Sequence, residues 1–334
     1  MITTKRLAAA GLAAGLAAAF AVPAAAVPPD DVYAKLVQIG RVVDAPGTTA
    51  IYGPMLANQS YDGVTISRDI PYAADPRAIL NVAGPSERGT RLRPVLIYVP
   101  GGGGNKQLDY EGGKPFLDNM NLAAVHHGLV GVVMQRVAPR GGPWDSGAHD
   151  IAAVIQWVHE NIERYGGDPR RVVIWGQSAG ANNLSNYLSH KEFWPGGRIG
   201  VKAAVVMSGG YNLAPLQAKA VNSAPRGPGD GGAAAIRSPA PPPPPVDPAA
   251  LLQRSTLPGF RALKIKTLVS AAELDPERTV ESSEMLKDVM CKAGNCPDYM
   301  LFAKESHMSE ILSINSDDKE VEGPVFAWIV KAAR

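Results

Sequence analysis

The fold is decided by the stretch Val172-Val-Ile-Trp-Gly176-Gln177-Ser178-Ala179-Gly180-Ala-Asn. In it a β-rich apolar run leads into Gly-x-Ser-x-Gly, and a helix-like run follows. A serine on so sharp a turn between strand and helix takes a strained backbone conformation that needs small flanking residues, and its hydroxyl is exposed beyond the sheet edge. Gly176 and Gly180 meet that need. Ser178 is therefore the candidate nucleophile, and the first amides of the following helix would face developing negative charge.

The pentapeptide alone is a weak signal, because 35 glycines in 334 residues allow chance matches to a glycine-rich turn with an incidental serine. The surrounding pattern adds weight. From residue 64 onward, β-rich runs alternate with helix-like segments, which predicts a mostly parallel sheet of about eight strands with helices on both faces. The expected strands are Val64 to Ser67, Ala78 to Val82, Pro94 to Val99, Val130 to Gln135, Val172 to Trp175, Ala203 to Met207, Thr267 to Ser270 and Tyr299 to Phe302.

One amphipathic helix is expected over Ile151 to Arg164. Its apolar residues recur at helical spacing, and Gly166-Gly167 would end it. The tract over 224–250 differs in composition, being rich in Pro, Gly and Ala with five consecutive prolines from Pro241. Such a tract favours polyproline II over a packed helix or a strand, so it is expected to be a surface excursion, either a solvated loop or a flap over a site.

A glycine run from Gly101 to Gly104 directly follows the strand that ends in Val99-Pro100. Residues without side chains let backbone N–H groups approach a substrate oxygen, so this run and the amide of Ala179 could form an oxyanion hole. A phosphate-binding loop is the rival interpretation, but the Gly-Lys-Ser/Thr ending is missing and Lys106 is followed by Gln107. A plain flexible turn is the third.

A serine hydroxyl needs a base to take its proton, and six histidines are available. His307 is the candidate because it alone lies in a loop just after the last expected strand. The strand that ends at Ser270 leads into a second such loop, which carries Glu273 and Asp275. Catalytic groups gather at this edge of an open sheet. Asp275 is preferred, since Pro276 restrains its backbone and the order Ser, Asp, His suits this architecture.

Composition limits the class of protein. With 46% hydrophobic and 19% charged residues the chain is expected to fold, and 33 basic against 31 acidic side chains leave no surplus for binding nucleic acid. Residues 1–26 have the layout of a cleaved signal peptide, namely Lys5-Arg6, an uncharged run from Leu7 to Val22, and small residues at Ala24 and Ala26. A membrane anchor is the alternative, but the run is short and rich in Ala and Gly. We therefore expect an exported protein, periplasmic or secreted, with one domain over 27–334 and no membrane span in the mature chain.

The two cysteines, Cys291 and Cys296, stand in Cys-Lys-Ala-Gly-Asn-Cys. An oxidising compartment makes a local disulfide the expected state, with two free thiols as the alternative. A zinc site would need further ligands that this neighbourhood lacks.

Together these segments resemble the α/β-hydrolase superfamily, and specifically its carboxylesterases and hormone-sensitive-lipase-like esterases. The resemblance runs from about Val64 to Ala332 and rests on Tyr98 to Gly104, Met134 to Pro139, Asp150 to Trp157, Tyr165 to Pro169, Gly176 to Ala181, Glu273 to Pro276 and His307. It implies Ser178 as nucleophile, Asp275 as the acid, and the amides of Gly102 and Gly103 as oxyanion donors. Pro100 stands where the family usually has His, and Gly104 where a bulky residue is common.

The activity that this resemblance implies is hydrolysis of small carboxylic esters, of short to medium acyl chain length, through an acyl-enzyme. That chemistry needs no metal or organic cofactor. A peptidase or a polymer-directed deacetylase or feruloyl esterase of the same fold is the nearest alternative, and a non-catalytic binding protein is an alternative of another class. No motif specifies the acyl group, the alcohol or the oligomeric state.

Overall fold

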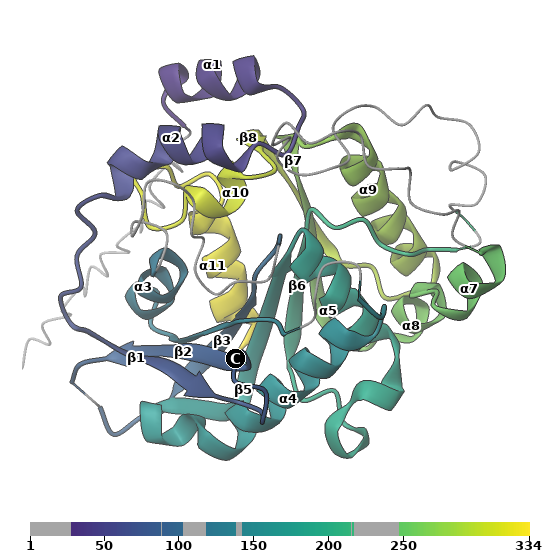
Figure 1. Cartoon of the computed structure of the whole chain (residues 1–334), viewed down its shortest axis with the longest axis horizontal. Coiled ribbons are helices and arrows are strands. Elements are labelled where there is room, and N and C mark those ends of the chain that lie inside the picture. The colour runs from purple at the N-terminus through teal and green to yellow at the C-terminus, as the bar shows by residue number, and fades with distance from the viewer. Residues whose placement is uncertain (1–27, 88, 103–117, 138–141, 215, 217–246) are drawn as a thin grey trace, which may run out of the picture.

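A computed structural model of the chain (Figure 1) describes residues 28–87, 89–102, 118–137, 142–214, 216 and 247–334. One sheet organises it, with the strand order β1-β2-β4-β3-β5-β6-β7-β8. All eight expected strands are confirmed, most of them longer than the apolar runs that signalled them. The strands are β1 (Val64–Pro71), β2 (Ile79–Pro85), β3 (Arg93–Val99), β4 (Val130–Met134), β5 (Gly167–Gln177), β6 (Ala203–Met207), β7 (Lys266–Leu274) and β8 (Asp298–Ser306).

The sheet is antiparallel at one end and parallel over the rest. β2 pairs antiparallel with both β1 and β4, whereas the five pairs from β4 to β8 are parallel. Consecutive parallel strands require crossovers, and these place helices against the sheet. The carboxyl ends of the parallel strands therefore share one edge, where the chain turns after Gln177, Leu274 and Ser306.

Helices cover both faces of the sheet, as expected (Figure 1). Side chains alternate along β3, so that Val95, Ile97 and Val99 enter one buried cluster while Leu96 and Tyr98 enter the other. The helices are α1 (Asp30–Ile39), α2 (Ala45–Leu56), α3 (Asn119–His126), α4 (Ser146–Asn161), α5 (Ala179–Ser189), α7 (Pro248–Gln253), α8 (Leu257–Ala262), α9 (Glu277–Lys292), α10 (Ser309–Leu312) and α11 (Glu322–Ala332).

Two boundaries differ from those expected. The helix expected over Ile151 to Arg164 begins earlier, at Ser146, and passes at Asn161 into a 3₁₀ turn that ends at Gly166, a left-handed residue with φ 83°. The Pro-rich tract is outside the described residues up to 246. Its last residues begin helix α7, because Asp247 accepts from the N–H of Ala249 at 3.0 Å and Pro248 fits the first helical turn.

The N-terminal helices α1 and α2 were not expected from any pattern. They cross the carboxyl edge of the sheet beside β7 and β8 (Figure 1). Tyr33 on α1 donates to the Glu273 carboxylate at 3.3 Å, and Arg41 in the α1–α2 link donates to the carbonyl of Asp275 at 3.0 Å. The beginning of the described chain is thereby fastened to the end of β7 and to the loop that carries the candidate acid.

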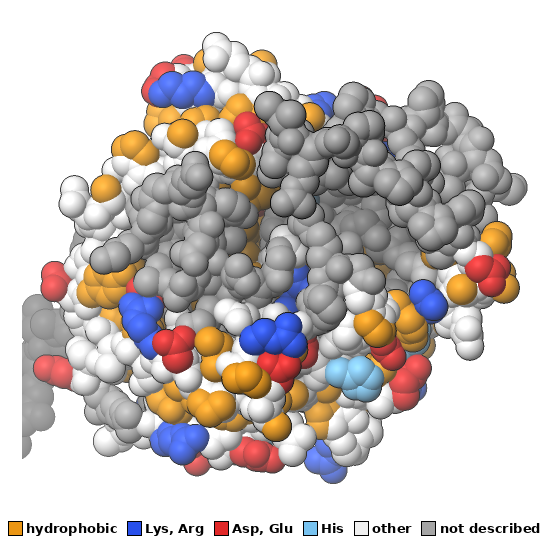
Figure 2. Space-filling model, in the orientation of Figure 1, with side chains coloured by type: hydrophobic (Ala, Val, Ile, Leu, Met, Phe, Trp, Pro, Cys, Tyr) orange, Lys and Arg blue, Asp and Glu red, His pale blue; other side chains and the backbone are white. Residues whose placement is uncertain are grey.

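Cys291 and Cys296 form a disulfide, as expected, which ties the last turn of α9 to the segment before β8. Residues 1–26, the predicted signal peptide, are outside the described part of the chain. Within the described ranges, no helix is both long and apolar enough to cross a bilayer. Basic and acidic side chains are interspersed on the face shown in Figure 2, in keeping with the nearly balanced composition.

Candidate active site

Ser178 stands between the end of β5 and the start of α5 in a strained conformation, with φ 54° and ψ −123°. Its neighbours must be small for geometric reasons. A Cβ added to Gly180 would lie 2.1 Å from the carbonyl oxygen of Val99, and one added to Gly176 would lie 2.7 Å from the carbonyl oxygen of Gly180. Both contacts are with backbone, which cannot rotate away. The predicted sharp turn is therefore confirmed, with a steric reason for each glycine.

Gly180→Ala is expected to lower the free energy of unfolding by about 1–3 kcal/mol, because β3 or α5 must shift to admit the methyl group. Ser178 should also react more slowly with a phosphonate probe, since the turn that presents it would be displaced. Chemical denaturation and probe labelling measure the two effects. Gly89→Ala is the control, since no atom lies within 4 Å of its added Cβ, and a comparable loss in that variant would contradict the steric argument.

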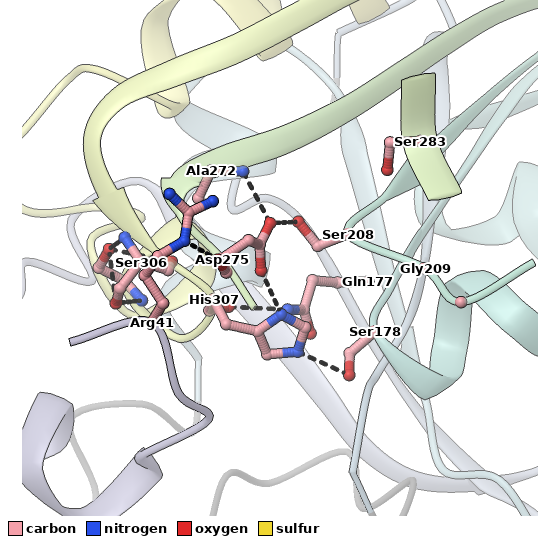
Figure 3. A network of polar contacts seen from close by, with 12 residues as sticks. Arg41, Gln177, Ser178, Ser208, Gly209, Ala272, Asp275, Ser283, Ser306 and His307 are labelled. Atoms are coloured by element: carbon pink, nitrogen blue, oxygen red, sulfur yellow. Dashed lines mark hydrogen bonds and ion pairs between the residues drawn. The ribbon is translucent and has the colours of Figure 1, made fainter. Parts of the chain in front are cut away.

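The three predicted catalytic side chains meet at the carboxyl edge of the sheet (Figure 3). His307 Nε2 lies 2.8 Å from Ser178 Oγ, and His307 Nδ1 lies 2.6 Å from Asp275 Oδ1. Ser178 follows β5, Asp275 follows β7, and His307 follows β8. One imidazole therefore bridges hydroxyl and carboxylate, the arrangement that nucleophilic acyl transfer requires.

Asp275 is fully buried and has several polar partners. Its Oδ2 accepts from Ser208 Oγ at 2.6 Å and from the N–H of Ala272 at 2.8 Å, while Oδ1 faces the imidazole. These contacts on both oxygens fix the orientation of the carboxylate. Glu273, the other carboxylate that the sequence offered, accepts instead from Tyr33 and from the N–H of Lys304 at 2.8 Å, so it anchors α1 and strand β8 at Lys304.

The other histidines that the sequence offered are held away from Ser178. Their ring nitrogens contact other groups: His126 with Asn315, His127 with Glu322, His159 with the carbonyl of Gly200, His190 with that of Asn186, and His149 with Asp145 at the longer distance of 3.9 Å. Among the six, the structure brings His307 alone to the candidate nucleophile.

Glu310 was missed by the sequence analysis, although it lies beside the triad. It is fully buried, and its carboxylate lies within 4.8 Å of the Asp275 carboxylate and a ring nitrogen of His307. Burial raises the pKa of the Glu310 carboxyl well above its usual value, and the negative charge of Asp275 raises it further. A neutral Glu310 avoids a second negative charge behind the imidazole. In the sequence, the feature that places Glu310 near the site is its position three residues after His307.

Two further polar side chains, one bonded to the candidate base and one to the candidate acid, were also missed. Gln177, the last residue of β5, donates from Nε2 to the carbonyl of His307 at 2.9 Å. Ser208, which follows β6 with φ 50°, donates to Asp275. Each lies at the carboxyl end of a strand, where catalytic groups gather in such sheets. Their positions relative to the strands could therefore have indicated them, although they belong to no motif.

The candidate oxyanion hole is described in part. Gly101 packs directly on the nucleophile, since a Cβ there would lie 3.0 Å from Ser178 Cβ, and Gly102 has φ 52°. The buried Arg136 donates to the carbonyls of Pro100 at 3.1 Å and Gly102 at 2.9 Å. Because the N–H after a carbonyl points the opposite way in a trans peptide, these bonds turn the N–H of Gly101 away from Arg136. Gly103, the other predicted donor, is outside the described residues.

Comparison with known proteins gives evidence about the family of this chain that is independent of the site geometry. Residues 78–226 match the carboxylesterase family. Among curated relatives, juvenile hormone esterase of Tribolium castaneum is 34% identical over 113 residues, 33% of this chain and 19% of that protein. Carboxylesterase 5A of Homo sapiens is 37% identical over 119 residues, 33% of this chain and 20% of that protein. The chain thus spans about a fifth of the length of these relatives.

Solved structures match over nearly the whole chain. A bacterial heroin esterase has a TM-score of 0.61 at 21% identity, covering 91% of this chain and 98% of the other. A thermostable esterase from Pseudomonas putida has a TM-score of 0.59 at 18% identity, covering 91% and 95%. At such identities the likeness establishes the fold, and that fold is the α/β-hydrolase fold.

Proposed function

We propose that this chain, which belongs to the α/β-hydrolase superfamily and matches the carboxylesterase family over residues 78–226, is a serine esterase that hydrolyses small carboxylic esters. The observation that carries the proposal is the unbroken contact from Ser178 Oγ through His307 to Asp275, at 2.8 and 2.6 Å. This contact supplies a nucleophile, a base and a group that orients the base, and those three roles define the chemistry.

In the first step Ser178 Oγ attacks the ester carbonyl while His307 Nε2 takes its proton. Asp275 keeps the other ring proton on Nδ1 and stabilises the imidazolium. The carbonyl oxygen becomes an oxyanion, which would be held by the N–H groups of Ala179, Gly102 and Gly103. When the tetrahedral intermediate collapses, the imidazolium gives its proton to the departing alcohol.

In the second step water replaces the alcohol. His307 takes a proton from the water as its oxygen attacks the acyl-enzyme. When the second tetrahedral intermediate collapses, the bond to Ser178 Oγ breaks, the imidazolium returns its proton to that oxygen, and the carboxylic acid is released. The same side chains serve both halves, and Asp275, whose Oδ1 lies 2.6 Å from His307 Nδ1, is the carboxylate placed to balance the imidazolium.

The expected substrates carry short to medium acyl chains. A neighbour of the same fold, esterase B of Lactobacillus rhamnosis, is described with a tributyrin phosphonate, and it shares 17% identity with a TM-score of 0.57. A phosphonate of that kind is therefore a suitable probe for Ser178, because it mimics the tetrahedral intermediate.

Hydrolysis of p-nitrophenyl esters from acetate to palmitate by residues 27–334 tests the proposed activity. We expect activity that falls beyond short and medium acyl chains. A p-nitroanilide series run in parallel would reveal a peptidase, and acetylated or feruloylated polymers would reveal a polymer-directed esterase. Absence of hydrolysis in every series, together with absence of phosphonate labelling, would leave the non-catalytic alternative.

We also propose that residues 1–26 are removed on export to the periplasm or the medium. The support is the signal-peptide layout of that segment together with the Cys291–Cys296 disulfide, a bond typical of oxidising compartments. N-terminal sequencing of protein recovered outside the cytoplasm should begin at Val27, and recovery of intact Met1 there would overturn cleavage.

A further inference from the structure

A row of buried polar side chains links the N-terminal helix α2 to the segment that carries His307. Tyr52 lies on α2, Glu305 is the second-last residue of β8, and Asp318 lies in the loop between α10 and α11. All three side chains are inaccessible to solvent. Neither carboxylate takes part in the mechanism above, although burying such groups is costly unless they are paired or protonated.

The contacts run directly to the histidine segment. Tyr52 OH donates to Asp318 Oδ2 at 2.8 Å, and Glu305 Oε2 accepts from Ser309 Oγ. Ser309 Oγ in turn accepts from the N–H of Ser306 at 2.7 Å. Ser306 and Ser309 bracket His307 in the chain, so this bonding closes the turn that presents the imidazole.

The carboxyl groups of Glu305 and Asp318 repel each other when both are ionised, and they attract each other only if they share a proton. Glu305 Oε1 accepts from no donor of normal geometry within the described ranges, and the Asp318 side chain is its acidic neighbour. Burial raises the pKa of Glu305 well above its usual value, and the charge of Asp318 adds to the effect. One shared proton would replace this repulsion with a hydrogen bond between Glu305 Oε1 and Asp318.

The charged groups around the pair leave its proton in place. The acidic neighbours favour protonation, whereas the basic ones, Lys319 and Lys304, act on Asp318 and on Glu320. The titratable groups that act on the pair are Glu310 and Glu320, with Tyr52 donating to Asp318, Lys319 beside Asp318, and Lys304 beside Glu320.

We propose that Tyr52, Asp318 and Glu305 are positioning residues, joined through one shared proton, that hold the turn carrying His307 in its catalytic place. Helix α2, which packs against α10, is then part of the apparatus that orients the base. The inference rests on the proposed function, because it takes His307 as the base. It assigns the N-terminal helix to the same site.

Tyr52→Phe tests the link, with Tyr187→Phe as the matched control. Each removes one hydroxyl from a fully buried tyrosine, and each hydroxyl donates at 2.8 Å, to Asp318 and to the carbonyl of Ile199 respectively. Because small displacements of catalytic groups are costly, Tyr52→Phe should lower kcat about tenfold with KM within twofold. It should also weaken the downfield proton NMR signal of His307 Nδ1–H. Equal kcat values for the two variants would overturn the proposal.

Glu305 variants test the shared proton. Glu305→Ala should lower kcat as Tyr52→Phe does, and Glu305→Gln should restore it to within about threefold, because its amide N–H donates to Asp318 where the proton was while its oxygen still accepts from Ser309. Failure of Gln to rescue, with Ala and Gln equally impaired, would overturn the shared proton.

The pH dependence of unfolding gives a readout that is independent of esterase activity. Since the pKa of Glu305 is raised on folding, the folded protein holds a proton that the unfolded chain releases above the usual glutamate range. Its stabilising contribution is complete below pH about 4.5 and is lost as pH rises toward the folded pKa. Glu305→Gln should flatten this decline, and an unchanged decline would count against the proposal even if the wild type hydrolysed no ester. If the wild type hydrolyses esters but Tyr52→Phe and Tyr187→Phe have equal kcat values, the positioning proposal fails and the proposed function stands.

Discussion

Ser178→Ala is expected to lower kcat for p-nitrophenyl acetate by about 10⁵- to 10⁶-fold, the scale observed when a triad serine is removed. The reason is structural: Ser178 Oγ is the hydroxyl that faces His307 Nε2, at 2.8 Å, and no acyl-enzyme can form without it. Residual hydrolysis would come from water positioned by the remaining site. Steady-state kinetics and labelling with a phosphonate measure the loss.

Ser185→Ala is the control for this variant. Ser185 lies on the same helix α5, is buried, and donates to the carbonyl of Ala181 at 2.7 Å rather than to the histidine. It should keep both activity and labelling. If Ser178→Ala retained wild-type hydrolysis or reacted with the probe, the nucleophile assigned here would be wrong.

Asp275→Asn is the second large effect, an expected loss in kcat of about 10⁴-fold. The carboxylate accepts from Ser208 and Ala272 on one oxygen and faces His307 Nδ1 with the other. The asparagine amide has one oxygen acceptor and one NH₂ donor, so it can replace the carboxylate on only one of these two sides. If its oxygen accepts from Ala272, its NH₂ faces Nδ1 and forces the ring proton onto Nε2, so that the imidazole can no longer take the proton of Ser178.

The opposite orientation of the asparagine amide is also unfavourable. Its NH₂ would then oppose the N–H of Ala272 in a fully buried position, which leaves a donor without an acceptor. The matched control is Glu273→Gln, a change of the neighbouring carboxylate that accepts from Tyr33 and from the Lys304 N–H. A large loss in Glu273→Gln with little change in Asp275→Asn would reverse the assignment of the acid.

Much of the fold could be predicted because its signals are local. The buried parallel strands appear as short apolar runs, and the turn at Ser178 requires glycines that the sequence displays. Once those strands are recognised, the rule that their carboxyl ends share an edge is enough to bring Asp275 and His307 to Ser178. The choice of Asp275 over Glu273 rested on Pro276 and chain order, and the structure supplies the reason, since Glu273 is occupied elsewhere.

The features that could not be predicted depend on contacts between distant parts of the chain. Helix α2 carries no apolar helical period, and the place of α1 and α2 is fixed by side chains such as Arg41 and Tyr52, which reach residues in the last third of the chain. In the sequence, nothing distinguishes Glu310 from a glutamate on the surface. In the structure it is fully buried beside Asp275. Its protonation depends on a burial that only the folded chain creates.

The placement of α1 and α2 has a consequence for the order in which the protein becomes active. The bonds from Arg41 to Asp275 and from Tyr52 to Asp318 join residues 234 and 266 positions apart in the chain. A ribosome therefore synthesises the candidate nucleophile, Ser178, well before the candidate base, His307, and helices α1 and α2 can make these contacts only after the last loops have been synthesised. Such distant pairings form slowly. If the proposed triad is correct, a growing chain carries an inert Ser178, and hydrolysis begins only when the last third of the chain has folded onto the first.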